Sequence, residues 1–240
     1  MKKITSVKNA VLLAVLIIIF GSCSKDSPIP QLVSLNVVNA SINVAAAQVN
    51  YFGAPLTFAT YTGNLVNYGA NLVYSVNAGS TNISINAQAD STKSIYSGNL
   101  TANAGDVYTL YLSGQSTAVD TVLRKESIPY HPFSDSSFGV RFINLSYNSN
   151  PVNVTLSATA TVNEFSGIGY KTITAFKNYT ALLSTAGYTF QVRDAGNNII
   201  ATYAFTSTTM PRFFNCTLAL IGQIGATGSN APKVIRVNNY

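Results

Sequence analysis

The chain holds few side chains that could perform chemistry at neutral pH. Histidine is the commonest general base, and the 240 residues contain one, His131. Because it stands in a proline-containing stretch that we interpret as a linker, and catalytic groups need rigid support, we expect a solvated side chain. Zinc sites need three or four His, Cys or carboxylate ligands, which this histidine and the free Cys216 do not supply. We predict no catalytic residue, no metal, no cofactor and no enzyme activity.

The acidic residues define no site by their spacing. Asp194, Asn197 and Asn198 could donate oxygens to Ca²⁺, but their spacing does not match an EF-hand loop, and a hairpin turn is favoured. The glycine series from Gly222 to Gly228 lacks the lysine and helix of a phosphate loop. An enzymatic alternative would need the fold to bring two carboxylates into one cleft. The eight acids after residue 22 are Asp26, Asp90, Asp106, Asp120, Glu126, Asp135, Glu164 and Asp194.

Cys23 is the residue with the clearest chemistry, which is lipid attachment. A basic start with three lysines precedes an apolar stretch over residues 10–20, followed by Gly21, Ser22 and Cys23. This order resembles a bacterial lipoprotein signal, and the apolar stretch is too short to span a bilayer. An ordinary secretory signal with an incidental cysteine is the alternative. We predict a signal peptide over residues 1–22 and a tether over residues 23–31, in which Pro28 and Pro30 disfavour helix and strand.

The residues after Cys23 bear on location. Lys25 and Asp26 resemble a surface-export signal of some Gram-negative groups. Several acyl chains on Cys23 would give stable membrane anchoring, since each buried methylene contributes about 0.8 kcal/mol. We expect a cell-envelope protein, held by lipid at the outer membrane and facing the periplasm or the surface.

Composition narrows the partners. The first 22 residues hold three lysines and no acid, which leaves eleven basic against eight acidic residues and a net charge of about +3. The basic residues are scattered, whereas nucleic-acid binding shows as a clustered patch, so we predict no nucleic-acid partner. Cys216 lies in an apolar run, which predicts a buried side chain and no disulfide.

Short alternating runs of β-branched and aromatic residues, separated by Gly and Asn turns, predict strands from Leu32 onward. In the first run we expect Val33, Leu35 and Val37 to share one face, and Tyr108, Leu110 and Leu112 to do so in a later one. Residues 74–76 and 83–85 flank the turn over residues 77–80 and read as a hairpin.

The second half of the chain repeats the first. Residues 35–41 align with 140–146, residues 73–85 with 180–192, and residues 107–114 with 214–222. Copies of about 100 residues fit sandwich domains of around seven strands. We therefore predict an all-β chain with two tandem immunoglobulin-like β-sandwich domains after the lipoprotein signal peptide. Their expected bounds are 32–125 and 138–240, with a linker over 126–137 that contains Pro129 and Pro132.

A family resemblance follows from three segments of the second copy. Residues 140–146 (VRFINLS), 148–154 (NSNPVNV) and 186–196 (AGYTFQVRDAG) resemble the domain-of-unknown-function family 4397. The first copy fits it only loosely, because residues 44–53 lack the proline. The resemblance implies tandem β-sandwiches in a bacterial envelope lipoprotein. It brings no activity and no catalytic residues.

Two functions remain open. The first is a non-catalytic envelope lipoprotein that serves as a surface binding, adhesion or assembly module for a protein partner. The alternative is a carbohydrate-binding accessory lipoprotein that uses tyrosines in loops, because exposed tyrosines can stack on sugars. Most tyrosines alternate with polar residues and are expected to pack within strands. The better surface candidates are Tyr61, Tyr68, Tyr130 and Tyr147.

Overall fold

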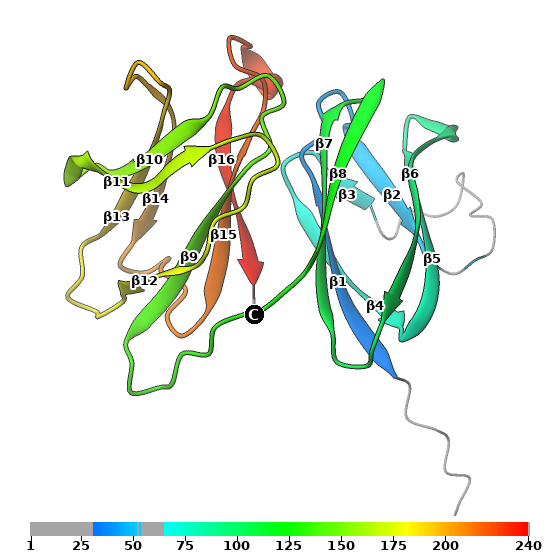
Figure 1. The fold of residues 1–240 in the computed structure, drawn as a ribbon, viewed down its shortest axis with the longest axis horizontal. Helices are drawn as coiled ribbons and strands as arrows, with labels where there is room; N and C mark the ends of the chain where they lie inside the picture. The colour runs from blue at the N-terminus through cyan, green and yellow to red at the C-terminus, as the bar shows by residue number, and fades with distance from the viewer. Residues whose placement is uncertain (1–30, 52, 54–64, 240) are drawn as a thin grey trace, which may run out of the picture. The chain divides into compact units, whose positions relative to one another are not determined.

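The computed structural model describes residues 31–51, 53 and 65–239, so Cys23, the predicted signal peptide and Tyr61 lie outside the described residues. The described part is all-β, with two β-sandwiches as predicted and one 3-10 turn, η1 (Gly228–Asn230) (Figure 1). None of its helices is long and apolar enough to cross a bilayer.

The first sandwich has two four-stranded sheets, in the orders β4-β1-β7-β8 and β3-β2-β5-β6. β1 and β7 run parallel, whereas the other neighbours run antiparallel. The strands are β1 (Leu32–Asn39), β2 (Ala46–Asn50), β3 (Leu65–Asn67), β4 (Asn71–Asn77), β5 (Gly79–Ala87), β6 (Asp90–Ala102), β7 (Val107–Gln115) and β8 (Ala118–Lys125).

The second sandwich repeats this topology strand for strand. Its sheets have the orders β12-β9-β15-β16 and β11-β10-β13-β14, and β9 runs parallel to β15. This order differs from the ABED and CFG sheets of a constant-type immunoglobulin domain, although the sandwich architecture is shared. The strands are β9 (Ser137–Asn144), β10 (Val152–Leu156), β11 (Thr159–Ile168), β12 (Lys177–Thr180), β13 (Gly187–Arg193), β14 (Ile199–Thr206), β15 (Asn215–Ile221) and β16 (Lys233–Asn239).

A buried asparagine marks the repeat at the end of β1 and of β9. Asn39 Nδ2 donates to a carbonyl of β3 at 3.0 Å, and Asn144 Nδ2 donates to a carbonyl of β11 at 3.0 Å. Each side-chain oxygen accepts from the backbone N–H two residues later, at Ser41 and Ser146. Because the two asparagines make equivalent hydrogen bonds at aligned positions, the predicted internal repeat is confirmed.

The hairpin predicted around residues 77–80 is wrong. β4 pairs with β1, whereas β5 pairs with β2 and β6 in the opposite sheet. The turn at Gly79, whose φ is +93°, therefore carries the chain from one sheet to the other. Alternating apolar residues on both sides of a short turn are the same in a hairpin and in a corner between sheets, so the pattern could not distinguish them.

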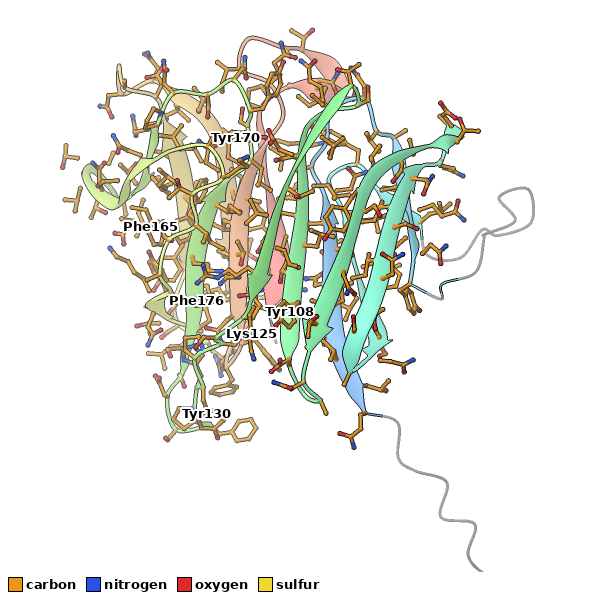
Figure 2. All side chains as sticks on the ribbon, turned by 45° about the vertical axis from the view of Figure 1, so that its right-hand side comes forward. Tyr108, Lys125, Tyr130, Phe165, Tyr170 and Phe176 are labelled. Atoms are coloured by element: carbon orange, nitrogen blue, oxygen red, sulfur yellow. The ribbon has the colours of Figure 1, made fainter. Side chains whose placement is uncertain are left out.

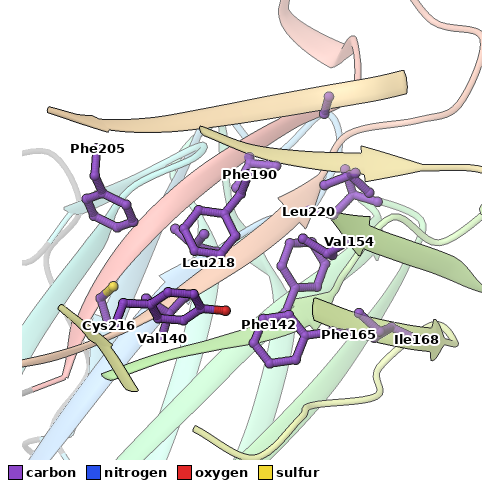
Figure 3. Close-up of a cluster of buried hydrophobic side chains, with 14 of the residues drawn as sticks. Val140, Phe142, Val154, Phe165, Ile168, Phe190, Phe205, Cys216, Leu218 and Leu220 are labelled. Atoms are coloured by element: carbon purple, nitrogen blue, oxygen red, sulfur yellow. The ribbon is translucent and has the colours of Figure 1, made fainter. Parts of the chain in front are cut away.

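Each sandwich has its own apolar core between its sheets. The predicted inward faces are confirmed: Val33, Leu35, Val37, Leu110 and Leu112 are buried in the first core, with Tyr108 packed against it. Figure 3 shows the second core, where the rings from β9, β11, β13 and β14 meet the aliphatic side chains of β10 and β15. Cys216 is buried there, as predicted. The labelled members are Val140, Phe142, Val154, Phe165, Ile168, Phe190, Phe205, Cys216, Leu218 and Leu220.

A third apolar cluster joins the two sandwiches. It is built from the outward faces of β1, β7, β9, β15 and β16, so every residue of β9 and β15 is buried. Residues 31–240 accordingly form one compact unit. Its buried members are Val38, Ala40, Tyr111, Ile143, Leu145, Ala219, Ile221 and Val237.

Equivalent strands of the two sandwiches run in the same direction. Tyr111 in the middle of β7 contacts Arg141 of β9, and Gln115 at the end of β7 donates to Tyr147 beyond the end of β9. β7 and β9 therefore begin at the same end of the unit, and so do β1 and β15, which run parallel to them. We call this the N-terminal end, because Leu32 begins β1 there (Figure 1).

Candidate functional site

A groove of about 450 Å³ lies between edge strand β4 of the first sandwich and edge strand β16 of the second. The β14–β15 connection forms its remaining wall. We call it the Phe214 groove, and its lining residues are Asn71, Val73, Thr209, Pro211, Phe214, Asn215, Arg236, Asn238 and Asn239.

The apolar part of the groove consists of side chains left in solvent. Phe214, just before the fully buried β15, is 57% exposed, and Val73, on the outer face of β4, is 43% exposed. The backbone of Phe213 has a φ of +69°, which turns the chain just before β15. The Phe213 ring then packs against Phe133, at 5.2 Å between centroids, while the next ring lines the groove.

The polar part of the groove consists of amides and one guanidinium. Asn71 Nδ2 donates to Asn36 at 2.9 Å, and Arg236 Nη1 donates to the carbonyl of Thr209 at 3.0 Å. These bonds fix both side chains. A guanidinium has five N–H groups, so Arg236 has further donors besides the one that binds the Thr209 carbonyl. Asn238 is exposed. An amide offers both a donor and an acceptor, so the groove can pair with the hydroxyl groups of a ligand.

His131 holds the β8–β9 connection against the groove wall and is not the solvated side chain that we expected. It is 5% exposed, and its Nε2 lies 3.0 Å from Asn215 Oδ1. Asn215 Nδ2 donates to the carbonyl of Pro129 at 2.7 Å, so its Oδ1 is the acceptor and His131 Nε2 carries the proton. The expectation failed because sequence does not show that β15 starts beside this connection.

Ser137 completes this buried cluster. Its hydroxyl lies 3.0 Å from His131 Nδ1 and 2.8 Å from Asp135 Oδ2. The order Ser, His, Asn superficially matches a nucleophile with its base and orienting amide. Ser137 is 7% exposed and lies at the first position of a strand buried on both faces. The cluster therefore fastens the connection to β9 and β15.

The carboxylates of the described residues serve local structure. Asp106 pairs with Lys125 at 2.7 Å and Asp120 with Lys171 at 2.9 Å, both near the surface. The Lys171 hydrogen bond lowers the pKa of Asp120, and the Lys125 hydrogen bond lowers that of Asp106. Glu164 accepts from the hydroxyl of a core tyrosine at 2.9 Å. Within the described ranges, no three His, Cys, Asp or Glu side chains gather as metal ligands.

The turn expected around Gly196 is confirmed. Asp194 Oδ1 accepts from the Asn198 backbone N–H at 2.8 Å, and both carboxylate oxygens accept from its side-chain amide. These bonds lower the pKa of Asp194. Asn197 adopts a φ of +65°, which asparagine tolerates in such turns.

The proposed surface tyrosines have different environments. Tyr130 is 82% exposed, at the tip of the β8–β9 connection (Figure 2). Tyr68 is half-buried under Lys233, whose Nζ lies 4.7 Å from the ring centroid. Tyr147 is partly buried and bonded to Gln115, while Tyr61 is outside the described residues. None of the three described tyrosines lines the Phe214 groove.

Sequence reasoning did not identify Phe214, Asn71, Arg236 or Asn238. The usable signal was the pair Phe213 and Phe214 immediately before a buried strand. Two large rings in a row before a strand that is buried on both faces do not both fit into the core, and here Phe213 packs against Phe133 while Phe214 is exposed. The partners from β4 and β16 are far apart in sequence and carry no such signal.

Comparisons with known proteins assign no family. No family model and no curated protein matches the chain. Among solved structures it is similar to one described as "Alpha-glucan recognition by family 41 carbohydrate-binding modules from streptococcal virulence factors", at 10% identity over 84% of this chain and 96% of that chain, with a TM-score of 0.23. Another, "Alpha-glucan binding by a streptococcal virulence factor", shows 12% identity over 78% and 92%, also with a TM-score of 0.23. Such TM-scores are too low to indicate a shared fold or ligand, and the resemblance to family 4397 stays a prediction.

Proposed function

We propose that the chain is a lipid-anchored, non-catalytic binding module of the bacterial cell envelope and that its ligand is a glycan. The observation that carries the proposal is the Phe214 groove, where an exposed ring and an exposed valine stand beside four asparagines and an arginine. Cys23 is the proposed anchor. A glycan carried by another cell or by the surrounding matrix would make the module an adhesin.

The chemistry of the groove suits a sugar that carries no positive charge. The C–H face of a pyranose is apolar and packs on an aromatic ring, while its hydroxyls need paired donors and acceptors. Phe214 supplies the ring, and Asn71 and Asn238 supply amides. Arg236 is the only charged side chain lining the groove among the described residues, and no carboxylate lines it.

A non-catalytic role agrees with how the reactive groups are used. His131 and Ser137 are buried in the connection that they fasten. Glu126 is buried against Arg141, and the remaining described acids pair with lysines, hydroxyls or turn amides at their own positions. The groove therefore holds a ligand without a nearby general acid or base.

Glycan-array screening of the chain from Ser24 to Tyr240 tests the proposal. We expect binding to a neutral glycan, lost on Phe214→Ala, because the substitution removes the apolar platform and leaves the strands intact. Tyr130→Ala is the matched control, since it removes an exposed aromatic outside the groove and should leave binding unchanged. An array without any bound glycan, or equal binding by the Phe214→Ala variant, would rule the proposed ligand out.

A further inference from the structure

The three most exposed large hydrophobic side chains of the described residues lie at one end of the second sandwich. Tyr130 is 82%, Phe133 84% and Leu183 83% exposed, whereas the other large hydrophobics are at most 57% exposed. Tyr130 and Phe133 lie in the β8–β9 connection, and Leu183 with the half-exposed Leu182 lies in the β12–β13 connection. Gathered apolar side chains of this size in solvent indicate a contact surface.

Hydrogen bonds join these connections into one surface. The Ala181 backbone N–H donates to the carbonyl of Ser136 at 2.6 Å, and the Phe213 N–H donates to that of Ser137 at 2.8 Å. Arg212 Nε donates to the Ala181 carbonyl at 2.7 Å. We call Tyr130, Phe133, Leu182, Leu183 and Phe213 the loop patch.

The support beneath the loop patch is rigid. His131 and Ser137 are buried directly under the β8–β9 connection, so Tyr130 and Phe133 project from a fixed base. Phe213 keeps a positive φ, which is costly for a bulky residue, and its ring packs edge-on against Phe133. The apolar side chains are therefore held outward by the fold.

The loop patch lies at the N-terminal end of the unit. The connections before β9, after β12 and before β15 all meet there, because β9 and β15 begin and the antiparallel β12 ends at that side. β1 also begins there, at Leu32, which is itself 43% exposed. The tether from Cys23 thus enters at the end that carries the loop patch.

The length of the tether limits how far this end can lie from its anchor. Eight residues lie between Cys23 and Leu32, and an extended chain spans at most about 3.3 to 3.6 Å per residue, so the nine steps reach about 30 Å. An acylated Cys23 sits in the bilayer surface, which keeps the N-terminal end close to lipid.

We propose that the loop patch inserts into the lipid surface that holds the anchor and so fixes how the module stands on the membrane. The proposal rests on the lipid anchoring in the proposed function. Tyrosine, phenylalanine and leucine suit the boundary between headgroups and acyl chains, and binding there grows with the apolar area that becomes buried. The second contact restrains the rotation that a single flexible tether would allow.

Tryptophan fluorescence on vesicles tests this proposal, because the chain contains no tryptophan. The chain beginning at Cys23 is coupled through that thiol to maleimide lipid in vesicles of phosphatidylethanolamine and phosphatidylglycerol; the buried Cys216 does not compete. Phe133→Trp reports on the loop patch. Thr227→Trp is the control, because Thr227 is exposed in the β15–β16 connection at the opposite end.

We expect the emission of Phe133→Trp to shift to shorter wavelength and to fall to half or less when the lipids carry brominated acyl chains, with Thr227→Trp unchanged. Adding Tyr130→Ser and Leu183→Ser to Phe133→Trp should restore the emission. An unquenched Phe133→Trp, or equal quenching at both positions, overturns the proposal. The loop patch would then be a contact surface for a protein partner. Chemical coupling supplies the anchor and no glycan is present, so neither absent acylation in cells nor absent glycan binding can produce that result.

Discussion

Arg141 Nη2 donates to Glu126 Oε1 at 2.7 Å, and both side chains are almost completely buried. Glu126 directly follows β8, whereas Arg141 lies in the middle of β9, so the pair fastens the start of the connection to the second sandwich. Arg141 also donates to Thr217 at 2.8 Å and lies 4.6 Å from the ring centroid of Phe176, which is labelled in Figure 2. The junction between the sandwiches therefore contains a buried charge pair beside its apolar cluster.

Breaking this pair should destabilise the protein strongly. Glu126→Gln leaves the Arg141 charge buried without its counter-ion, which costs about 3 to 5 kcal/mol. Guanidinium-induced unfolding of wild type and variant measures the difference. Lys125→Met removes an exposed partner of Asp106 one residue earlier and should change little, because exposed ion pairs contribute little. Equal stability of the Glu126→Gln and wild-type proteins would contradict the role of the pair.

The two repeat asparagines should be equally important. Asn39→Ala and Asn144→Ala each leave buried carbonyls without their donor, for which we expect a loss of about 1 to 3 kcal/mol apiece in free energy of unfolding. Asn99→Ala removes an exposed asparagine bonded to Ser80 and serves as the control. A loss at only one of the two repeat positions would show that their roles have diverged.

Gly139 is needed for the contact between His131 and Asn215. A Cβ at Gly139 would collide with Asn215 Oδ1 and lie 3.3 Å from His131 Nε2. Gly139→Ala should therefore cost about 1 to 3 kcal/mol by overpacking. The matched change Gly169→Ala meets only an ordinary contact at 3.5 Å and should be nearly neutral. Thermal unfolding of both variants measures the contrast, and a neutral Gly139→Ala would mean that the connection can shift freely.

Alkaline pH should destabilise the fold through its buried tyrosines. Burial raises the pKa of Tyr170 from 10.0 to about 12, and it also raises the pKa values of Tyr68, Tyr96, Tyr111 and Tyr179. A folded pKa above the unfolded one gives stability that is complete below pH 10 and lost as the pH rises through the folded value. The denaturant concentration at the midpoint of unfolding should therefore decrease as the pH is raised from about 10 to about 12. Tyrosinate absorbance of the folded protein that is complete near pH 10 would refute this.

The sequence predicted what depends on local patterns. Alternation placed Leu35 and Val37 in a core, and the aligned segments located Gly114 and Gly222, which both adopt positive φ near the ends of equivalent strands. Contacts between segments that are far apart in the sequence could not be predicted from these patterns. His131 is buried because β15 begins beside it, and the groove brings Asn71 together with Asn238 from the other end of the chain. Such positions depend on the order of strands in the sheets, which alternation does not encode.

The most direct test of the proposed function is to map the bound glycan on the protein by NMR. Side-chain amide resonances of Asn71 and Asn238 and the guanidinium resonance of Arg236 should shift on adding a glycan selected from the array, while those of Asn99, which lies away from the groove, stay in place. The Phe214→Ala variant should show no shifts. Shifts that fall elsewhere, with the groove resonances unmoved, would contradict the proposal that the Phe214 groove is the glycan site.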